Sequence, residues 1–319
     1  MRILMVGWNR FGDAVMSTAL IRHLLARYPE ARITLVCGAL AADVLAPMPN
    51  LERMVVIGKH RMKVPVLRML REFAFTRWDL IVDLKDTLVS RVARAPVTLI
   101  HRRPPPGVTT RAALSALVGT DRLAAPGLWF DRDALEAARA LVPEGRPVLA
   151  LGIGASNPTR YWPPERFAEL VARVRARYGS AVRPLVMALG SAEEADLAAG
   201  ALAGLPDDQR LDLTGRVPTI LGQCACLARA HLFVGNDSGF MHAAGALGLP
   251  TVGLFGVSDP DVFGDFYAGW RPVVPPGPAV TMADLPVDRV WAAVEGALPD
   301  PGRSAPAAGR PPRASAGGG

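Results

Sequence analysis

The loop at residues 235–239, Gly-Asn-Asp-Ser-Gly, combines small and polar residues in a way that suits anion binding. It follows the apolar run Leu232–Val234 and precedes a helical segment carrying His242, and a second apolar run covers Thr251–Phe255. We interpret the stretch as strand, loop, helix and strand, so the loop lies at the carboxyl end of a parallel strand, where open α/β sheets bind ligands. Because the loop also begins a helix, its unpaired N–H groups and the helix dipole favour an anion, and phosphate is the natural ligand.

The side chains around this loop suit different roles. Ser238 and Gly239 can present hydroxyl and backbone donors to a phosphate. Asp237 would repel phosphate, so we expect it to hold the loop, to accept a hydrogen bond from a sugar hydroxyl, or to cap the helix. His242 lies one turn into the helix; on residue type alone it is more often a hydrogen-bonded core histidine than a ligand contact.

A second polar loop, at residues 152–163, follows the apolar run that begins at Val148. Three of its side chains can donate hydrogen bonds to a diphosphate: Ser156, Thr159 and Arg160. A surface arginine is the alternative for Arg160, and we expect Trp162 to be a hydrophobic plug at a domain joint. The pair Gly152-x-Gly154 is a weak nucleotide signal, because the third glycine and the downstream acidic ribose partner are absent.

Gly12 and Asp13 lie between a first apolar run and a first helical segment. Gly12 allows a tight turn or a close approach to a ligand. Asp13 lies at or near the helix start, where an aspartate is commonly an N-cap. A general base is the second interpretation, and the two are compatible, although the helix dipole makes a carboxylate there a weaker base.

Apolar runs alternate with helical segments in two series, which predicts two Rossmann-like domains. The runs of the first series are Ile3–Val6, Ile33–Cys37, Met54–Ile57, Leu80–Val82 and Val97–Ile100, and those of the second are Val148–Ile153, Leu185–Leu189, Leu232–Val234 and Thr251–Phe255. Runs this apolar indicate parallel strands covered on both faces. The predicted helices are Ala14–Tyr28, Asp131–Val142, Pro164–Tyr178, Ala192–Leu202 and Ile220–Arg229.

We therefore expect an α/β protein with mostly parallel sheets and a central cleft between its two domains. The predicted domains are residues 1–145 and 146–298, joined near Pro143-Glu144-Gly145. Residues 299–319, rich in proline, glycine and alanine, have too little apolar bulk to fold, and we expect a disordered tail.

The net charge of +7 and the pI of about 9.9 favour a partner that carries negative charge. Basic residues cluster in two places in the first half, and those that we predict to contact an anionic partner are Lys59, Arg61, Lys63, Arg102 and Arg103. A solvated basic face is the equally weighted alternative. Nucleic acid is the weakest candidate partner, because zinc-finger spacing, aromatic-rich basic strands and zipper heptads are all missing.

Several other classes find no support in the sequence. Every apolar run is too short to span a bilayer, and residues 3–6 are too short for a signal-peptide core, so we expect a cytoplasmic location, including one on the inner face of the plasma membrane. The three cysteines suggest small buried side chains in a reducing compartment. Metal-ligand spacing, a P-loop and a nucleophile elbow are absent, so we expect no obligatory metal.

Taken in order, the three loops resemble glycosyltransferase family nine, the heptosyltransferases of lipopolysaccharide assembly. The resemblance covers residues 1 to about 290, and its most specific part is the last block, Gly235 to His242 with Phe255-Gly256 and Asp259-Pro260. It implies a GT-B fold and an inverting transfer from ADP-heptose to a lipopolysaccharide core or related glycan, without an obligatory metal. It also implies that the first domain binds mainly the acceptor and the second mainly the nucleotide-sugar.

Carried over by position, the resemblance assigns roles to particular residues. Asp13 is then the catalytic base, with Gly12 beside it, and Arg160 is the cation near the diphosphate; lysine is common in the family where Arg160 stands. Ser156, Thr159, Asp237, Ser238, Gly239 and His242 complete the donor site. An acidic donor-binding residue falls at Glu193 or Glu194, of which we expect Glu194, and a capping role is the alternative for both.

Three other functions remain open on the sequence. The first is another GT-B-like nucleotide-sugar enzyme, such as a UDP-sugar transferase or epimerase. The second is a non-catalytic protein that binds a nucleotide-sugar. The third is a dinucleotide oxidoreductase, which the missing fingerprint disfavours.

Overall fold

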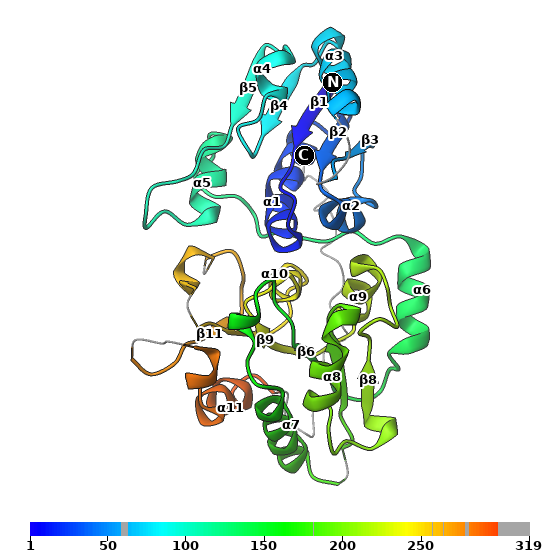
Figure 1. Ribbon diagram of the computed structural model, residues 1–319, viewed down its shortest axis with the longest axis vertical. Coiled ribbons are helices and arrows are strands. Elements are labelled where there is room, and N and C mark those ends of the chain that lie inside the picture. The colour runs from blue at the N-terminus through cyan, green and yellow to red at the C-terminus, as the bar shows by residue number, and fades with distance from the viewer. Residues whose placement is uncertain (59–62, 181, 257, 264, 278–280, 299–319) are drawn as a thin grey trace, which may run out of the picture. The chain divides into compact units, whose positions relative to one another are not determined.

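The protein folds into two units, each built on one parallel sheet (Figure 1). The structure, a computed structural model, describes residues 1–58, 63–180, 182–256, 258–263, 265–277 and 281–298; the side chains of residues 63–68 and the predicted disordered tail lie outside that description. The first unit is Met1–Trp129 and the second begins at Phe130.

The division falls before the one expected from the sequence, near residue 145. The intervening helix α6 (Arg132–Leu141) packs against α9 (Ile220–Leu227), and Arg229 Nε donates to the carbonyl oxygen of Val142 at 2.8 Å. These contacts make α6 part of the second unit.

The first unit has a five-stranded parallel sheet with the order β3-β2-β1-β4-β5. Its strands are β1 (Arg2–Val6), β2 (Arg32–Cys37), β3 (Leu51–Val56), β4 (Leu80–Asp83) and β5 (Val97–Ile100). Its helices are α1 (Phe11–Arg27), α2 (Ala39–Leu45), α3 (Lys63–Phe75), α4 (Val89–Val92) and α5 (Thr110–Leu117).

The two edge strands of this sheet differ from the prediction. All five runs were expected to be covered on both faces, but β3 and β5 contain no fully buried residue, whereas β4 is buried throughout. An edge strand has a neighbour on one side only, so its apolar side chains stay partly exposed. On the central strands, alternate residues such as Leu4, Val6 and Ile81 pack with Phe73 of α3 and Val89 of α4.

The second unit has a six-stranded parallel sheet with the order β11-β10-β9-β6-β7-β8. Its strands are β6 (Val148–Gly152), β7 (Leu185–Leu189), β8 (Arg210–Asp212), β9 (Leu232–Asn236), β10 (Thr251–Leu254) and β11 (Trp270–Val273). Besides α6 and α9, its α-helices are α7 (Pro164–Tyr178), α8 (Ala195–Ala201), α10 (Gly239–Ala246) and α11 (Val287–Glu295). Short 3₁₀ turns are η1 (Pro158–Arg160), η2 (Ala192–Glu194), η3 (Asp207–Gln209), η4 (Pro260–Val262) and η5 (Met282–Asp284).

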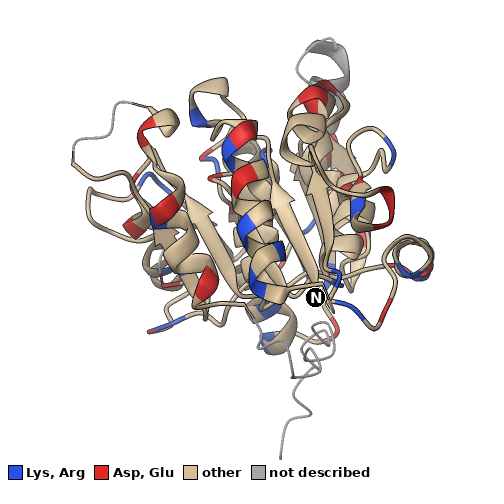
Figure 2. Ribbon diagram, turned by 90° about the horizontal axis from the view of Figure 1, so that it is seen from below, with Lys and Arg blue, Asp and Glu red and all other residues tan. Residues whose placement is uncertain are grey.

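The core of the second unit lies between its sheet and the helices α7, α8 and α11. Strand residues Leu151, Val186 and Val234 meet Phe167 of α7 and Val290 of α11. Charged positions are concentrated on the helices, and the strands behind them in Figure 2 are almost entirely uncharged. This distribution is that of parallel strands buried on both faces.

Both sheets change direction beside their first strand. In the first unit the chain runs from β1 to β2 and β3 on one side and then to β4 and β5 on the other, so the switch point lies between β1 and β4. In the second unit it lies between β6 and β9. Ligands of open α/β sheets bind outside the carboxyl ends of the strands at such points.

The three cysteines are free thiols in buried positions, as expected. Within the described residues, none of the helices combines the length and apolar character needed to cross a bilayer.

Candidate active site

Asn236 joins the two loops that flank the switch point of the second sheet. It is the last residue of β9 and is fully buried. Its Oδ1 accepts from the backbone N–H of Trp162 at 3.1 Å, and its Nδ2 donates to the carbonyl oxygen of Ile153 at 2.6 Å. The polar loop after β6 is therefore fixed to the carboxyl end of β9 by one neutral amide.

Trp162 is a hydrophobic plug, but it lies elsewhere than expected. It was predicted at a domain joint, and it lies in the core of the second unit, 1% exposed. Its indole contacts Phe167 edge to face, with ring centroids 4.8 Å apart, and its Nε1 donates to the carbonyl oxygen of Leu285 at 2.8 Å. The segment between the polar loop and α7 is thus fixed to the core of the second unit by Trp162.

The glycines near the switch point make room for neighbouring side chains. Gly152 and Gly235 are register partners on β6 and β9, and a Cβ on Gly152 would lie 2.5 Å from the ring of Phe233. A Cβ on Gly154 would lie 1.8 Å from Glu194 Oε1. The Gly-x-Gly pair therefore serves packing and the approach of a carboxylate.

Arg160 and Asp237 form an ion pair across the switch point. Arg160 Nη1 lies 3.0 Å from Asp237 Oδ2, and Ser258 Oγ donates to the same oxygen at 2.6 Å. The Asp237 side chain is 6% exposed and that of Arg160 is 32% exposed. Of the roles expected for Asp237, holding the loop is confirmed; helix capping is wrong, because Ser238 is the N-cap residue of α10. Among the described residues, Asp237 Oδ1 has no hydrogen-bond donor.

Ser238 and Gly239 lie where the sequence placed them, at the start of α10. The first N–H groups of this helix have no partner within the helix. The Oγ of Ser238 is buried, and the described residues offer it no hydrogen bond. A hydroxyl and several backbone donors therefore converge at the positive end of a helix dipole, an arrangement that suits an anion.

His242 is a core residue. It is 4% exposed, its Nδ1 shares a hydrogen bond with the Tyr267 hydroxyl at 3.1 Å, and its ring contacts Phe263 edge to face at 4.9 Å. Burial lowers the pKa of His242 to about 4, against the opposing charge of Asp237. At neutral pH the imidazole is uncharged, so it does not supply a cation to the loop.

Glu194 faces the loop after β6, whereas Glu193 is exposed. Glu194 Oε2 accepts from the N–H of Ser191 at 2.8 Å, closing a capping box, and its Oε1 accepts from the Tyr161 hydroxyl at 3.3 Å. The neighbouring loop after β7 is held by Gln223, whose side-chain amide donates to and accepts from the backbone of Gly190 at 2.9 and 3.0 Å. Ser156 and Thr159 are both exposed in the first loop, as are Asn157, the N-cap of η1, and Pro158 between them.

Asp13 lies in the first turn of α1, with Gly12 before it. The N-cap is Arg10, whose extended backbone provides no side-chain cap, so the expectation that Asp13 is itself a cap is wrong. As the third residue of the helix, Asp13 is partly exposed and lies beside the positive end of the helix dipole.

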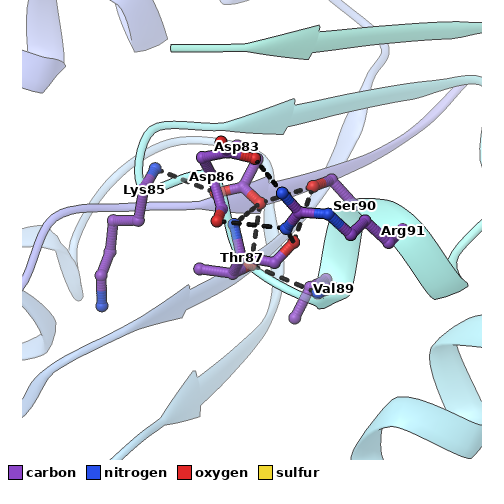
Figure 3. Close-up of polar contacts among 7 residues, drawn as sticks. All are labelled: Asp83, Lys85, Asp86, Thr87, Val89, Ser90 and Arg91. Atoms are coloured by element: carbon purple, nitrogen blue, oxygen red, sulfur yellow. Dashed lines mark hydrogen bonds and ion pairs between the residues drawn. The ribbon is translucent and has the colours of Figure 1, made fainter. Parts of the chain in front are cut away.

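Asp83 forms a polar cluster that the sequence analysis missed (Figure 3). It is the last residue of β4 and is fully buried. Its carboxylate accepts four hydrogen bonds of 2.7–2.9 Å from the turn that follows: from the N–H groups of Lys85 and Thr87 and from the hydroxyls of Thr87 and Ser90. Burial raises the pKa of Asp83, but these hydrogen bonds outweigh burial and hold it below its ordinary value.

The predicted acceptor residues are only partly described. Arg102 and Arg103 follow β5 and are exposed. Lys59 and Arg61 lie outside the described residues; Lys63 begins α3, but its side chain lies outside as well. Over the described ranges, His, Cys, Asp and Glu form no group of three that could hold a metal ion.

Comparisons with known proteins identify the family of the chain. Residues 107–273 match the model of glycosyltransferase family 9 (heptosyltransferase). Lipopolysaccharide heptosyltransferase 2 of Salmonella typhimurium is 30% identical over 305 residues, covering 82% of this chain and 84% of the relative. The ADP-heptose lipopolysaccharide heptosyltransferase II of Escherichia coli superposes with a TM-score of 0.74 at 24% identity, covering 93% of this chain and 98% of that one. An E. coli heptosyltransferase solved with ADP gives 0.71 at 17% identity, covering 93% and 100%.

The two solved structures confirm the expected GT-B type fold of two Rossmann-like units. The family model and the Salmonella relative carry the assignment itself. The chain belongs to glycosyltransferase family 9 and is a glycosyltransferase.

Proposed function

We propose that this protein transfers a heptose, with inversion, from ADP-heptose to a lipopolysaccharide core or related anionic glycan. The observation that carries the proposal is that each unit has polar side chains suited to part of the reaction at the switch point of its sheet. The second has anion donors and the Arg160–Asp237 pair, and the first has Asp13. The proposed sugar and nucleotide are those for which the related heptosyltransferases are named.

The donor diphosphate binds at the switch point of the second sheet. Ser238 Oγ and the first N–H groups of α10 donate to its oxygens, and Arg160 neutralises the charge that grows on the leaving ADP. Asp237 Oδ1 accepts from a sugar hydroxyl. Ser156, Thr159 and Glu194 border the same loops, Gly12 lies next to the base, and His242 supports the α10 helix from the core.

Asp13 acts as the general base. Its carboxylate takes the proton of the acceptor hydroxyl while that oxygen forms a bond to the anomeric carbon. The bond between the anomeric carbon and the phosphate oxygen breaks, and its electron pair leaves with ADP. Attack opposite the leaving group inverts the anomeric centre. No metal ion is required in this scheme, because protein donors stabilise the leaving group.

The acceptor is anionic and binds the first unit. Arg102 and Arg103, together with Lys59, Arg61 and Lys63, supply positive charge for it. A glycolipid acceptor would bring the protein to the inner face of the plasma membrane as a peripheral protein.

A transfer assay tests this proposal. Purified protein is incubated with heptose-deficient lipopolysaccharide and one donor, which is ADP-heptose or a UDP-, GDP- or dTDP-sugar. The mass of the glycolipid product is then measured by mass spectrometry. We expect one added heptose with ADP-heptose alone. Asp13→Asn should lower the rate by about 10²- to 10⁴-fold, because general-base catalysis contributes that much.

Asp133→Asn is the matched control, since Asp133 is an exposed acid in the first turn of α6. It should transfer at the normal rate. Turnover retained by Asp13→Asn would remove Asp13 from the mechanism, and transfer from a UDP-sugar instead of ADP-heptose would replace the proposed donor.

A further inference from the structure

The switch point of the first sheet lies between the loop after β1 and the turn after β4. Val6 and Asp83 are register partners at the carboxyl ends of these strands. Asp13 follows the first loop, and the turn of residues 84–88 forms the other side. By the rule for open α/β sheets, a ligand of this unit contacts both segments.

The turn after β4 is held in one conformation by buried charge and by an unusual backbone. The Asp83 carboxylate binds the turn from below through four hydrogen bonds. Asp86 adopts a left-handed backbone with φ of 51°, and Arg91 donates to both its carboxylate and its carbonyl oxygen. A left-handed backbone is uncommon for residues other than glycine, although aspartate adopts it more readily than most, and such conformations are concentrated at functional sites.

Lys85 is the cation that this turn presents. Its backbone N–H binds Asp83, while its side chain extends away from the cluster (Figure 3). Lys85 is exposed, and within the described residues no carboxylate lies within salt-bridge distance of its ammonium. The fixed turn therefore presents a positive charge that the described carboxylates of the first unit do not neutralise.

Two aromatic side chains lie beside this turn. Trp8 Nε1 donates to the carbonyl oxygen of Leu84 at 2.8 Å, and the Trp8 ring meets His101 edge to face at 5.4 Å. Both rings are partly exposed. Trp8 lies five residues before Asp13, so an amphipathic ring surface adjoins both the cation and the segment that leads to the base.

The charge of Lys85 also acts toward the other side of β1. Burial raises the pKa of the Cys37 thiol to about 11, and the positive charge of Lys85 opposes that rise. Cys37 ends β2, on the far side of β1 from β4. Lys85 follows β4 and Cys37 ends β2, so both residues lie at the carboxyl edge of the sheet, on either side of β1, from which the loop to Asp13 departs.

We propose that Lys85 pairs with an acidic group of the acceptor, a carboxylate or a phosphate, and that Asp83 is the residue that positions it. This inference rests on the proposed function and adds to it a specificity-determining contact outside the basic clusters at residues 59–63 and 102–103.

Steady-state kinetics of Lys85→Gln test the contact. With heptose-deficient lipopolysaccharide as the varied substrate, we expect the acceptor KM to rise about 10- to 100-fold, as for loss of a charge-assisted hydrogen bond. The kcat should change little, and the KM for ADP-heptose should stay unchanged. Lys85→Arg should recover part of the affinity. Arg32→Gln, which removes one exposed charge at the amino edge of the same sheet, should behave as wild type.

Neutralised acceptors identify the acidic group. The same glycolipid is prepared with its carboxyl groups reduced and, separately, with its phosphates removed. On one of these two acceptors, the KM of wild type should rise as much as the KM of Lys85→Gln rises on the intact acceptor. The KM of Lys85→Gln should not rise further on that same modified acceptor. The inference would be overturned, with transfer itself intact, if Lys85→Gln had the acceptor KM of wild type. It would also be overturned if Lys85→Gln raised the KM by the same factor on all three acceptors. Absence of transfer by wild type to all three would overturn the proposed function and Lys85's role with it.

Asp83→Asn tests positioning. We expect it to raise the acceptor KM without changing the KM for ADP-heptose, and the double variant with Lys85→Gln should be no worse than Lys85→Gln alone. Ser90→Ala, which removes one of the four hydrogen bonds, is the milder variant if Asp83→Asn does not fold. A shift of the pH–rate profile at constant acceptor KM would instead show that Lys85 acts on the ionisation of Asp13, and would contradict the proposed contact.

Discussion

Asp83 and Asn236 occupy equivalent positions in the two sheets, but their side chains make different hydrogen bonds. Each is the last residue of the strand beyond the switch point, and each is fully buried. Asn236 reaches across the switch point and binds the backbone at Ile153 and Trp162. Asp83 binds only the turn that follows its own strand.

The difference follows from what each side chain must satisfy. A backbone carbonyl needs a donor and a backbone N–H needs an acceptor; a neutral amide offers both, whereas an ionised carboxylate only accepts. The turn after β4 presents four donors, and a carboxylate accepts them all. The second switch point is therefore cross-linked and carries its own ion pair, whereas the first presents Lys85 without an acidic partner among the described residues.

Replacing each of the two side chains by the other type tests this comparison, and the change at Asn236 should have the largest effect on the free energy of unfolding. Asn236→Asp would place a carboxylate oxygen against the Ile153 carbonyl oxygen in a fully buried position, and we expect a loss of about 3 kcal/mol or more in the free energy of unfolding. Because burial disfavours the ionised form, the loss should shrink as the pH falls. Urea unfolding at several pH values measures it.

The opposite change, Asp83→Asn, should cost less. One carbonyl oxygen still accepts from the turn, so we expect about 1–2 kcal/mol at neutral pH. The pKa of Asp83 is lowered in the folded state, so its contribution is present above its unfolded pKa and is lost as the pH falls through the folded value. Equal losses for the two exchanges would show that the two positions do not differ as described.

A third effect belongs to the second unit alone and appears only on acidification. The pKa of His242 is lowered by burial, so the unfolded chain binds its proton first on acidification. Stability from this residue is therefore fully present above its unfolded pKa and falls as the pH drops toward about 4, by about 1–3 kcal/mol in all. His242→Gln should flatten that part of the stability profile. Identical profiles for wild type and variant between pH 4 and 7 would argue against a buried neutral imidazole.

Local patterns predicted much of the fold. Apolar runs such as Ile3–Val6 and Leu185–Leu189 mark β1 and β7, because a buried parallel strand leaves an uninterrupted apolar signature. The short strand β8 carries Arg210 and Asp212, and β11 contains Pro272, so neither shows that signature. The helices α2, α3, α4, α5 and α11 were also missed.

The site was predicted where chemistry is local and missed where it depends on pairing. The loop of Ser238 and Gly239 can be recognised from residue types alone, since small and polar residues directly follow an apolar strand. The partnership of Arg160 with Asp237 joins residues far apart in sequence, which spacing cannot reveal. Asp83 had a usable signal: an acidic residue directly after the apolar run Leu80–Val82, with Thr87 and Ser90 following.

Calorimetric titration of ADP into wild type, Arg160→Gln and Asp13→Asn tests most directly whether the diphosphate half of the chemistry belongs to the second unit. Arg160→Gln should weaken ADP binding about tenfold or more, as expected for a charge-assisted hydrogen bond, whereas Asp13→Asn should leave the Kd within about twofold of wild type. Weaker binding by Asp13→Asn together with an unchanged Kd for Arg160→Gln would contradict the assignment of the two switch points.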